Sequence, residues 1–288
     1  MDTNIKEYGR LYGVATPIGN LKDISLRAIE VLEAVDFIAC EDTRNTVKLL
    51  NYYNIHKPLT SYHEHNKIEK AYEIIKEVKR GRDCAFVTDA GMPAISDPGE
   101  ELVRIAREEG VEISIIPGAS ACLCAVALSG LSSRSFVFEG FIPVEKKNRK
   151  KVMERLKSEE RTIVIYEAPH RLVKTLKELK IIFGAGRRLS LVREITKKYE
   201  EVLATDFKEM VSLCDEGGYL PRGEYVLVIE GKPESEAMAD IALLWKDIDI
   251  ASHLNLYLDQ GLDKKAAIKQ VAKDRGVSKR EIYNYLVK

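Results

Sequence analysis

Residues 84–99 read Cys84-Ala85-Phe86-Val87-Thr88-Asp89-Ala90-Gly91-Met92-Pro93-Ala94-Ile95-Ser96-Asp97-Pro98-Gly99, an apolar run followed by a loop rich in Gly, Pro and Asp. An amphipathic pattern over residues 100–109 comes next. Gly91 has no Cβ to keep the backbone away from a ligand, and Pro93 and Pro98 stiffen the loop. A simple strand-to-helix connection needs fewer residues. The segment predicts a ligand-binding loop between a buried strand and a helix, with an ordinary connection as the alternative.

The far end of this loop carries the signals of a helix start. Asp97 is the predicted N-cap, Pro98 the first helical residue and Glu100 the capping-box partner. We expect these residues to fix the loop to the helix that follows.

Short apolar runs and helical patterns alternate through the first half of the chain. The predicted strands are residues 11–15, 37–40, 85–87 and 113–116, and the predicted helices are residues 24–35, 43–53 and 100–109. This alternation is typical of an α/β fold with a largely parallel sheet.

A second α/β set follows, with strands at 136–141, 162–166, 189–193 and 225–229 and helices at 147–158 and 172–182. Ser129-Gly130-Leu131-Ser132-Ser133 interrupts both periodicities and is the predicted hinge. After Gly231-Lys232-Pro233 the pattern is all-helical. We predict an N-terminal α/β domain over 1–128, a second α/β domain over 129–232 and a small helical domain over 233–288.

The end of the chain resembles a basic helix-turn-helix. Predicted helices at 264–275 and 279–286 flank a Gly-containing turn, and Ser278 and Glu281 form a capping box. Basic residues far outnumber acidic ones from Asp263 onward. Lys279 and Arg280 are candidates for nucleic-acid contact; a solvated basic face is the alternative.

Composition restricts the class of protein. With 45 basic and 45 acidic residues there is no net field, so any nucleic-acid contact must depend on local patches. The five cysteines form neither a CxxC pair nor a disulfide framework, which favours buried thiols in a reducing cytoplasm. No apolar stretch approaches membrane-spanning length. We expect a soluble cytoplasmic protein without membrane contact.

Several common motifs fail in context. Gly184-Ala185-Gly186-Arg187-Arg188-Leu189 follows a predicted helix and lacks the final Gly of a dinucleotide fingerprint. Walker, zinc-finger and GxSxG patterns are missing from the sequence. Tyr62-His63-Glu64-His65-Asn66 lacks HExxH spacing, so we expect no metal site.

Three further segments combine a strand end with a Gly/Pro or Pro/His loop. They are Val14-Ala15-Thr16-Pro17-Ile18-Gly19-Asn20, Ile116-Pro117-Gly118-Ala119-Ser120-Ala121 and Tyr166-Glu167-Ala168-Pro169-His170-Arg171. Any α/β protein has such connections, but four of them, with polar groups beyond the strand ends, predict a composite cleft.

Together these segments resemble the tetrapyrrole-methylase superfamily, and within it the bacterial ribosomal RNA small subunit methyltransferase I family. The resemblance extends over nearly the whole chain and is carried also by Cys40-Glu41-Asp42-Thr43-Arg44, Arg193-Glu194-Ile195-Thr196-Lys197 and Gly223-Glu224-Tyr225. The departures from the family pattern are mild, with Met92 where Thr is usual, Ile195 where Leu is common and Arg222 where Lys is common.

The resemblance implies two α/β domains of tetrapyrrole-methylase type with S-adenosyl-L-methionine in the cleft between them. It also implies methyl transfer to the ribose 2'-hydroxyl of a cytidine in the decoding centre of 16S rRNA, with naked rRNA or the 30S subunit as partner. A homodimer is expected because dimers are common in the superfamily. By carry-over, the cofactor-binding residues are Pro17, Asp89, Ala90, Gly91, Met92, Pro93, Ile95, Ser120, Ala121, Tyr166, Glu167, Glu224 and Tyr225.

The sequence leaves the proton acceptor open. The ribose hydroxyl is a weak nucleophile, so a positioned base is expected. Glu41 and Asp42 follow a strand and are candidates, although a helix N-cap with a surface ion pair fits them equally. Lys197 would serve if burial lowered its pKa. His170 is a further candidate.

Basic residues near the expected cleft are candidates for gripping RNA, with solvated faces as the alternative. They are Arg44, Lys147, Arg149, Lys150, His170 and Arg171, besides Lys279 and Arg280. Two rival functions remain: a tetrapyrrole-like small-molecule methylase of the same superfamily, and a non-enzymatic helix-turn-helix regulator that senses a ligand.

Overall fold

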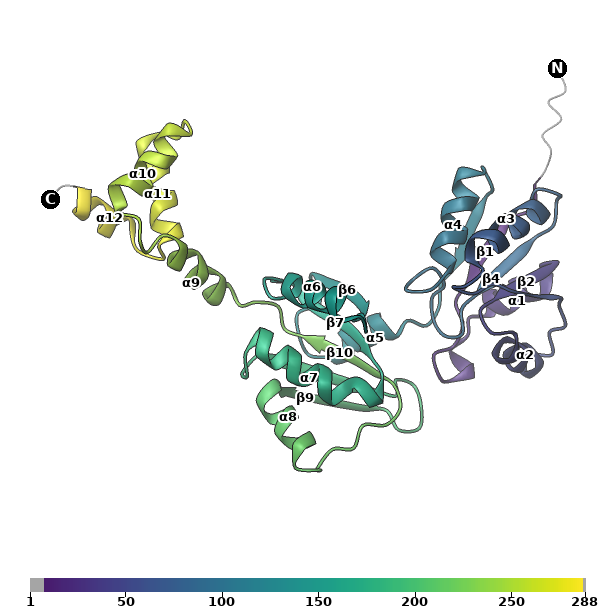
Figure 1. The fold of residues 1–288 in the computed structure, drawn as a ribbon. Helices are drawn as coiled ribbons and strands as arrows, with labels where there is room; N and C mark the ends of the chain where they lie inside the picture. Colours follow the sequence, from purple (N-terminus) through teal and green to yellow (C-terminus); the bar gives the residue numbers. More distant parts are fainter. Residues whose placement is uncertain (1–7, 287–288) are drawn as a thin grey trace, which may run out of the picture.

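The computed structural model describes residues 8–286. Figure 1 shows three parts in a row: an N-terminal α/β domain, a second α/β domain, and a group of C-terminal helices that follows an extended connection. No helix among residues 8–286 is long and apolar enough to span a membrane.

The first domain is built on a parallel sheet in the order β3-β2-β4-β1-β5. Its strands are β1 (Leu11–Val14), β2 (Phe37–Cys40), β3 (Leu59–Ser61), β4 (Cys84–Val87) and β5 (Ile113–Ile116). Its helices are α1 (Leu26–Ala34), α2 (Thr43–Tyr52), α3 (Lys67–Val78) and α4 (Gly99–Glu108), with a 3₁₀ turn, η1, at Leu21–Asp23. The sequence did not predict β3 and α3.

Helices cover both faces of this sheet. Side chains of α1 and α2 pack on one face, and those of α3 and α4 pack on the other. Every residue of β2 and β4 is buried, as expected for a strand covered on both sides. The chain passes from β1 to the α1 face and from the neighbouring β4 to the α4 face, so the loops after both strands lie at the same carboxyl edge of the sheet.

The second domain carries a mixed sheet in the order β6-β7-β10-β8-β9, in which only β6 and β7 are parallel. Its strands are β6 (Phe136–Phe141), β7 (Thr162–Glu167), β8 (Arg188–Arg193), β9 (Glu201–Asp206) and β10 (Tyr225–Ile229). Its helices are α6 (Lys146–Leu156), α7 (Pro169–Phe183) and α8 (Phe207–Asp215) on one face, with α5 (Ala121–Leu128) on the other. By its packing α5 joins this domain, whereas the predicted boundary at residue 129 follows it.

The C-terminal helices are α9 (Glu234–Leu244), α10 (Ile250–Asp259), α11 (Lys264–Asp274) and α12 (Lys279–Leu286). A small apolar core joins α10, α11 and α12. The predicted capping box is confirmed: the Ser278 backbone N donates to Glu281 Oε2 at 3.1 Å, and the Glu281 backbone N donates to Ser278 Oγ at 3.2 Å.

The helix start after the 88–98 loop differs slightly from the prediction. Asp97 fixes it as expected, because Oδ1 accepts hydrogen bonds from the backbone N atoms of Gly99 at 2.8 Å and Ala94 at 3.0 Å. However, α4 begins at Gly99 with Pro98 as its N-cap, one residue later than predicted. Helix ends commonly shift by this amount because the first turn is only partly hydrogen-bonded.

Candidate active site between the two domains

Three loops of the first domain converge at the carboxyl edge of its sheet. Thr16, after β1, exchanges backbone hydrogen bonds of 3.0 and 3.1 Å with Gly91, after β4. Gly91 has φ +86°, and a Cβ there would lie 3.3 Å from Cγ2 of Ile18. After β5, Gly118 packs against Ala15 so closely that a Cβ would lie 2.8 Å from the Ala15 Cβ. Three of the four loops in the predicted composite cleft therefore meet at this edge.

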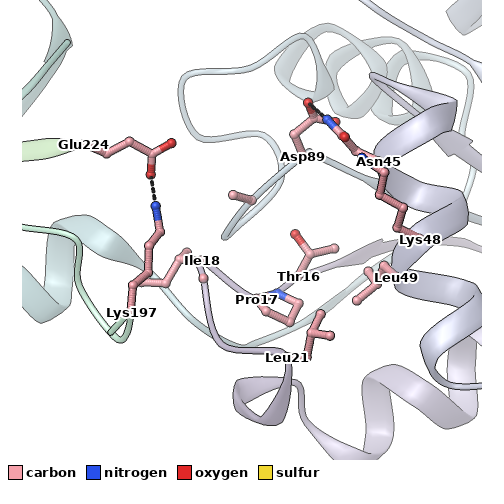
Figure 2. A pocket seen from close by; sticks show the side chains of 12 residues that line it. Thr16, Pro17, Ile18, Leu21, Asn45, Lys48, Leu49, Asp89, Lys197 and Glu224 are labelled. Atoms are coloured by element: carbon pink, nitrogen blue, oxygen red, sulfur yellow. Dashed lines mark hydrogen bonds and ion pairs between the residues drawn. The ribbon is translucent and has the colours of Figure 1, made fainter. Parts of the chain in front are cut away.

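An interdomain cavity of about 320 Å³ opens beside these loops (Figure 2). Its walls are Thr16, Pro17, Ile18, Gly19, Leu21, Asn45, Lys48, Leu49, Asp89, Ala90, Lys197 and Glu224. Lys197 and Glu224 come from the second domain and face the α2 side chains across the cavity. Both domains are therefore needed to complete it.

The cavity contains some of the predicted residues and others that the sequence did not single out. Pro17, Asp89, Ala90, Lys197 and Glu224 line it as sequence candidates. The α2 residues Asn45, Lys48 and Leu49 were missed. Their spacing of three and four residues places them on one helix face, immediately after the segment Glu41-Asp42-Thr43-Arg44, and that periodicity was the available signal.

Asp89 is the carboxylate of the first domain that faces the cavity. Its Oδ2 accepts a hydrogen bond from Asn45 Nδ2 at 3.0 Å, and its Oδ1 accepts from the Asp42 backbone N at 3.3 Å (Figure 2 draws the Asn45 contact). These two donors hold the side chain in place at the end of β4.

The two acidic candidates after β2 have different environments. Asp42 caps α2 by accepting from the Arg44 backbone N at 2.8 Å, and it pairs with the Arg44 guanidinium at 2.6 Å. The hydrogen bonds from Arg44 lower the pKa of Asp42 to about 2. Such a carboxylate is a poor proton acceptor, so the structure assigns Asp42 the capping role.

Glu41 is half-buried at the end of β2 and does not line the cavity. Burial raises its pKa, and the nearby charges of Asp89 and Asp97 raise it further. Its Oε2 accepts a hydrogen bond from Thr88 Oγ1 at 3.4 Å. A carboxylate with a raised pKa is better matched to proton transfer near neutral pH than Asp42.

Lys197 is an ammonium group held between carboxylates. Its Nζ lies 2.8 Å from Glu224 Oε2 and 3.1 Å from Glu194 Oε1, and its alkyl chain lies against Gly19, where a Cβ would collide with it. Burial alone would lower the pKa of Lys197, but the hydrogen bonds to Glu224 and Glu194 outweigh burial and raise it. The condition for Lys197 to act as a base, a pKa lowered by burial, is therefore not met.

Comparison with other proteins finds a matching family and relatives that match this chain over nearly its full length. The tetrapyrrole (corrin/porphyrin) methylase family matches residues 10–211. Ribosomal RNA small subunit methyltransferase I of Halalkalibacterium halodurans is 47% identical over 276 residues, which cover 96% of this chain and 94% of that protein. The chain belongs to the ribosomal RNA small subunit methyltransferase I family. The Bacillus subtilis protein of the same name as the Halalkalibacterium halodurans relative is 44% identical over 278 residues, which cover 96% of this chain and 94% of that protein.

Solved structures agree with this family on the fold. Diphthine synthase superposes with a TM-score of 0.62 at 14% identity, over 77% of this chain and 90% of that one. Uroporphyrin III C-methyl transferase from Thermus thermophilus has a TM-score of 0.56 at 18% identity, over 77% and 97%. This chain thus has two α/β domains of tetrapyrrole-methylase type and a helical C-terminal part.

Some other residues carried over for cofactor binding lie around the start of α5. Ser120 caps this helix, and the Tyr166 hydroxyl accepts a hydrogen bond from the Cys122 backbone N at 3.0 Å. Burial raises the pKa of Tyr166 to about 12. Ser120 and Tyr166 do not line the interdomain cavity, and neither do Ala121, Met92, Pro93 and Ile95.

Glu167 is buried among partners within the second domain and does not line the cavity. It is 2% exposed, and its carboxylate contacts Arg171 Nε at 3.1 Å and accepts from Thr175 Oγ1 at 2.5 Å. The ring of Tyr225 also points away, into the core beneath α7 and α8, where its hydroxyl accepts from the Arg222 backbone N at 3.0 Å. The structure therefore does not bring these two side chains to the cavity.

Two arginines predicted to contact RNA instead make hydrogen bonds within the second domain. Arg149 is 8% exposed and donates to Glu178 at 2.6 Å and Thr175 at 2.8 Å. Arg171 donates to the Ile142 carbonyl at 2.5 Å. Phosphate binding by either group would break these bonds, which corrects the sequence interpretation.

The remaining RNA candidates lie on the surface. Arg44 has an 85% exposed side chain, although Asp42 holds its guanidinium. The other exposed candidates are Lys147, Lys150, His170, Lys279 and Arg280. Among residues 8–286, no cluster of three His, Cys, Asp or Glu side chains is placed to hold a metal ion.

Proposed function

We propose that this chain transfers the methyl group of S-adenosyl-L-methionine to the ribose 2'-hydroxyl of a cytidine in the decoding centre of 16S rRNA. The observation that carries the proposal is the cavity completed by both domains, in a chain whose relatives over nearly their full length are named ribosomal RNA small subunit methyltransferase I. A cytoplasmic location stays a prediction from the cysteine pattern, and a homodimer stays a prediction from the resemblance.

The chemistry of the cavity fits the cofactor. Asp89 and Glu224 present carboxylates, Lys48 and Lys197 present ammonium groups, and Pro17, Ile18 and Leu49 present apolar surface. A ligand that carries charges of both signs on an apolar body suits such walls. Residues 89–93 and 95, the start of α5 and Tyr166 would complete its binding site. When bound, the cofactor supplies a methyl group on a positively charged sulfur.

The chain's own residues then align the acceptor and remove its proton. Holding the two reacting groups in line in a water-excluded site accounts for a large part of the rate increase that an enzyme gives to a transfer reaction. In this proposal Asp89, which faces the cavity, and Glu41, whose pKa the charge of Asp89 raises, act together as acceptors of the proton of the ribose hydroxyl. Lys197 remains charged and holds the Glu224 carboxylate.

Activity should fall on the acid side at a higher pH than an ordinary glutamate would produce. Glu41 accepts a proton only when ionised, and its pKa is raised, so protonation removes activity as the pH falls through that raised pKa. We expect Glu41→Gln to lower kcat about 100-fold. Asp42→Asn is the matched control and should leave the acid limb in place. An unchanged kcat and acid limb in Glu41→Gln would remove Glu41 from the mechanism.

Lysines of α6 are expected to contact phosphates. Replacing both Lys147 and Lys150 with Ala should flatten the dependence of log K on log salt for RNA binding by about 0.7 for each phosphate that the variant no longer neutralises. Lys208→Ala, an exposed lysine on α8, is the charge-matched control. An unchanged slope in the double variant would exclude phosphate binding by these lysines.

The choice of acceptor separates this function from its rivals. Labelled S-adenosylmethionine is incubated with the full chain and, in parallel, 30S subunits, naked 16S rRNA, a porphyrin precursor or duplex DNA. We expect label in the ribosomal RNA, on the subunit or naked. Label only in the porphyrin supports a small-molecule methylase, and specific DNA binding without turnover supports a regulator.

A further inference from the structure

A bulge in β6 turns Phe141 toward the same face as Phe138. The pairing of β6 with β7 shifts between Phe138 and Gly140, and Gly140 has φ +69°. In a regular strand, side chains three residues apart point to opposite faces. Here both phenylalanine rings contact the Tyr166 ring, with centroid distances of 4.9 Å for Phe138 and 5.5 Å for Phe141. The bulge therefore re-aims Phe141, as bulges near functional sites often do.

Phe141 is exposed but its backbone is fixed. The ring is 56% exposed, whereas the next residue, Ile142, is fully buried. Arg171 donates to the Ile142 carbonyl, and Arg149 donates to the Pro143 carbonyl at 3.4 Å. The two internal arginines thus hold the segment that presents the ring. An aromatic side chain held in this way loses little conformational entropy when a partner stacks on it.

The bulge also lies where the two domains meet. A Cβ on Gly140 would come within 2.6 Å of Ser96 Oγ, so this position touches the loop that follows β4. The same loop contains Asp89 and Ala90, which line the interdomain cavity. Phe141 therefore adjoins the loop that forms one wall of the proposed active site.

The helix that follows carries unneutralised positive charge. Lys146, Lys147, Lys150 and Lys151 are exposed, and none of them has an ion pair with any residue in the described part of the chain. Two nearby carboxylates are engaged elsewhere, since Glu139 pairs with Arg155 and Glu145 accepts from Asn148. The only carboxylate within α6 is Glu154, so the helix keeps an excess of positive charge. Figure 1 shows α6 beside β6. An exposed ring is thus followed by four free ammonium groups.

We infer that Phe141 stacks on an unpaired base of the RNA substrate near the methylated nucleotide, while the α6 lysines bind the adjoining phosphates. This inference rests on the proposed function and adds to it that the substrate segment is single-stranded at this surface. Stacking needs an open base face, which an RNA double helix hides, and a basic surface beside an aromatic ring is the usual arrangement for unpaired nucleic acid.

Binding is tested without methyl transfer by using Phe141→Trp as a fluorescent probe. The only natural tryptophan is Trp245, so the wild-type chain gives the baseline. We expect quenching by a short unpaired oligocytidylate, but not by a duplex RNA of equal length or by S-adenosylmethionine alone. Quenching by the cofactor alone would mean that the ring faces the cofactor, and no quenching by any of the three would also overturn the inference.

Kinetics give the second readout. Phe141→Ala should raise the KM for RNA about tenfold, within the range for removal of one stacking partner, and leave the KM for S-adenosylmethionine unchanged. Phe141→Trp should restore the wild-type value. Val144→Ala, an exposed apolar residue in the same segment, is the control. Unchanged RNA kinetics in Phe141→Ala would contradict the inference, whereas failure of the proposed function would show separately as a wild-type chain that methylates no RNA.

Discussion

Asp89→Asn is expected to lower kcat for methyl transfer at least about 100-fold, because the variant removes the carboxylate of the first domain that faces the cavity. The amide has nearly the same size, and its oxygen still accepts one of the two hydrogen bonds that fix Asp89. The free energy of unfolding should therefore change little. Steady-state kinetics together with urea unfolding measure both quantities.

The control for Asp89 is Glu100→Gln, which makes the same carboxylate-to-amide change on the exposed start of α4. It should retain wild-type kinetics. If Asp89→Asn also retained them, the cavity beside the 88–98 loop would not be the site of methyl transfer.

Glu167→Ala is expected to lower the free energy of unfolding by about 3 kcal/mol, since removing one partner of a buried ion pair leaves a charge without compensation. The charge left behind is that of Arg171, and Thr175 loses the acceptor for its hydroxyl. Urea unfolding measures the loss, with the exposed Glu154→Ala as control. At temperatures where the variant is folded, its KM for S-adenosylmethionine should equal the wild-type value.

The Glu167 result separates two roles for one residue. Carry-over from the family resemblance places Glu167 at the cofactor, whereas its contacts place it inside the second domain. A raised KM with unchanged stability would favour the cofactor role and contradict the structural one.

Much of the fold followed from local pattern. Strands β2 and β4 could be predicted from their continuous apolar runs, because a strand covered on both faces consists mostly of apolar residues. The edge strand β9 was missed, since its residues alternate between half-buried and exposed and include Glu201 and Asp206. The antiparallel pairing of β10 also depends on tertiary contacts that no local pattern specifies.

The site was readable only in part. Gly91 indicated close backbone approach and the resemblance placed Pro17 at the cleft, and the structure places both at the converging loops. The protonation and the ion pairing of a charged side chain, in contrast, depend on partners distant in sequence. Lys197 keeps its proton because of Glu224, and Arg149 is occupied by Glu178. Neither pairing can be derived from spacing, so the sequence left the proton acceptor and the RNA contacts open.

The most direct test of the account is the position of the transferred methyl group. After incubation of 30S subunits or naked 16S rRNA with the full chain and labelled S-adenosylmethionine, the RNA is digested to nucleosides and the labelled product is identified by mass spectrometry. The account predicts label in 2'-O-methylcytidine, at one position in the decoding centre and dependent on Asp89. Label on a base, on another nucleoside, or in no RNA at all would contradict it.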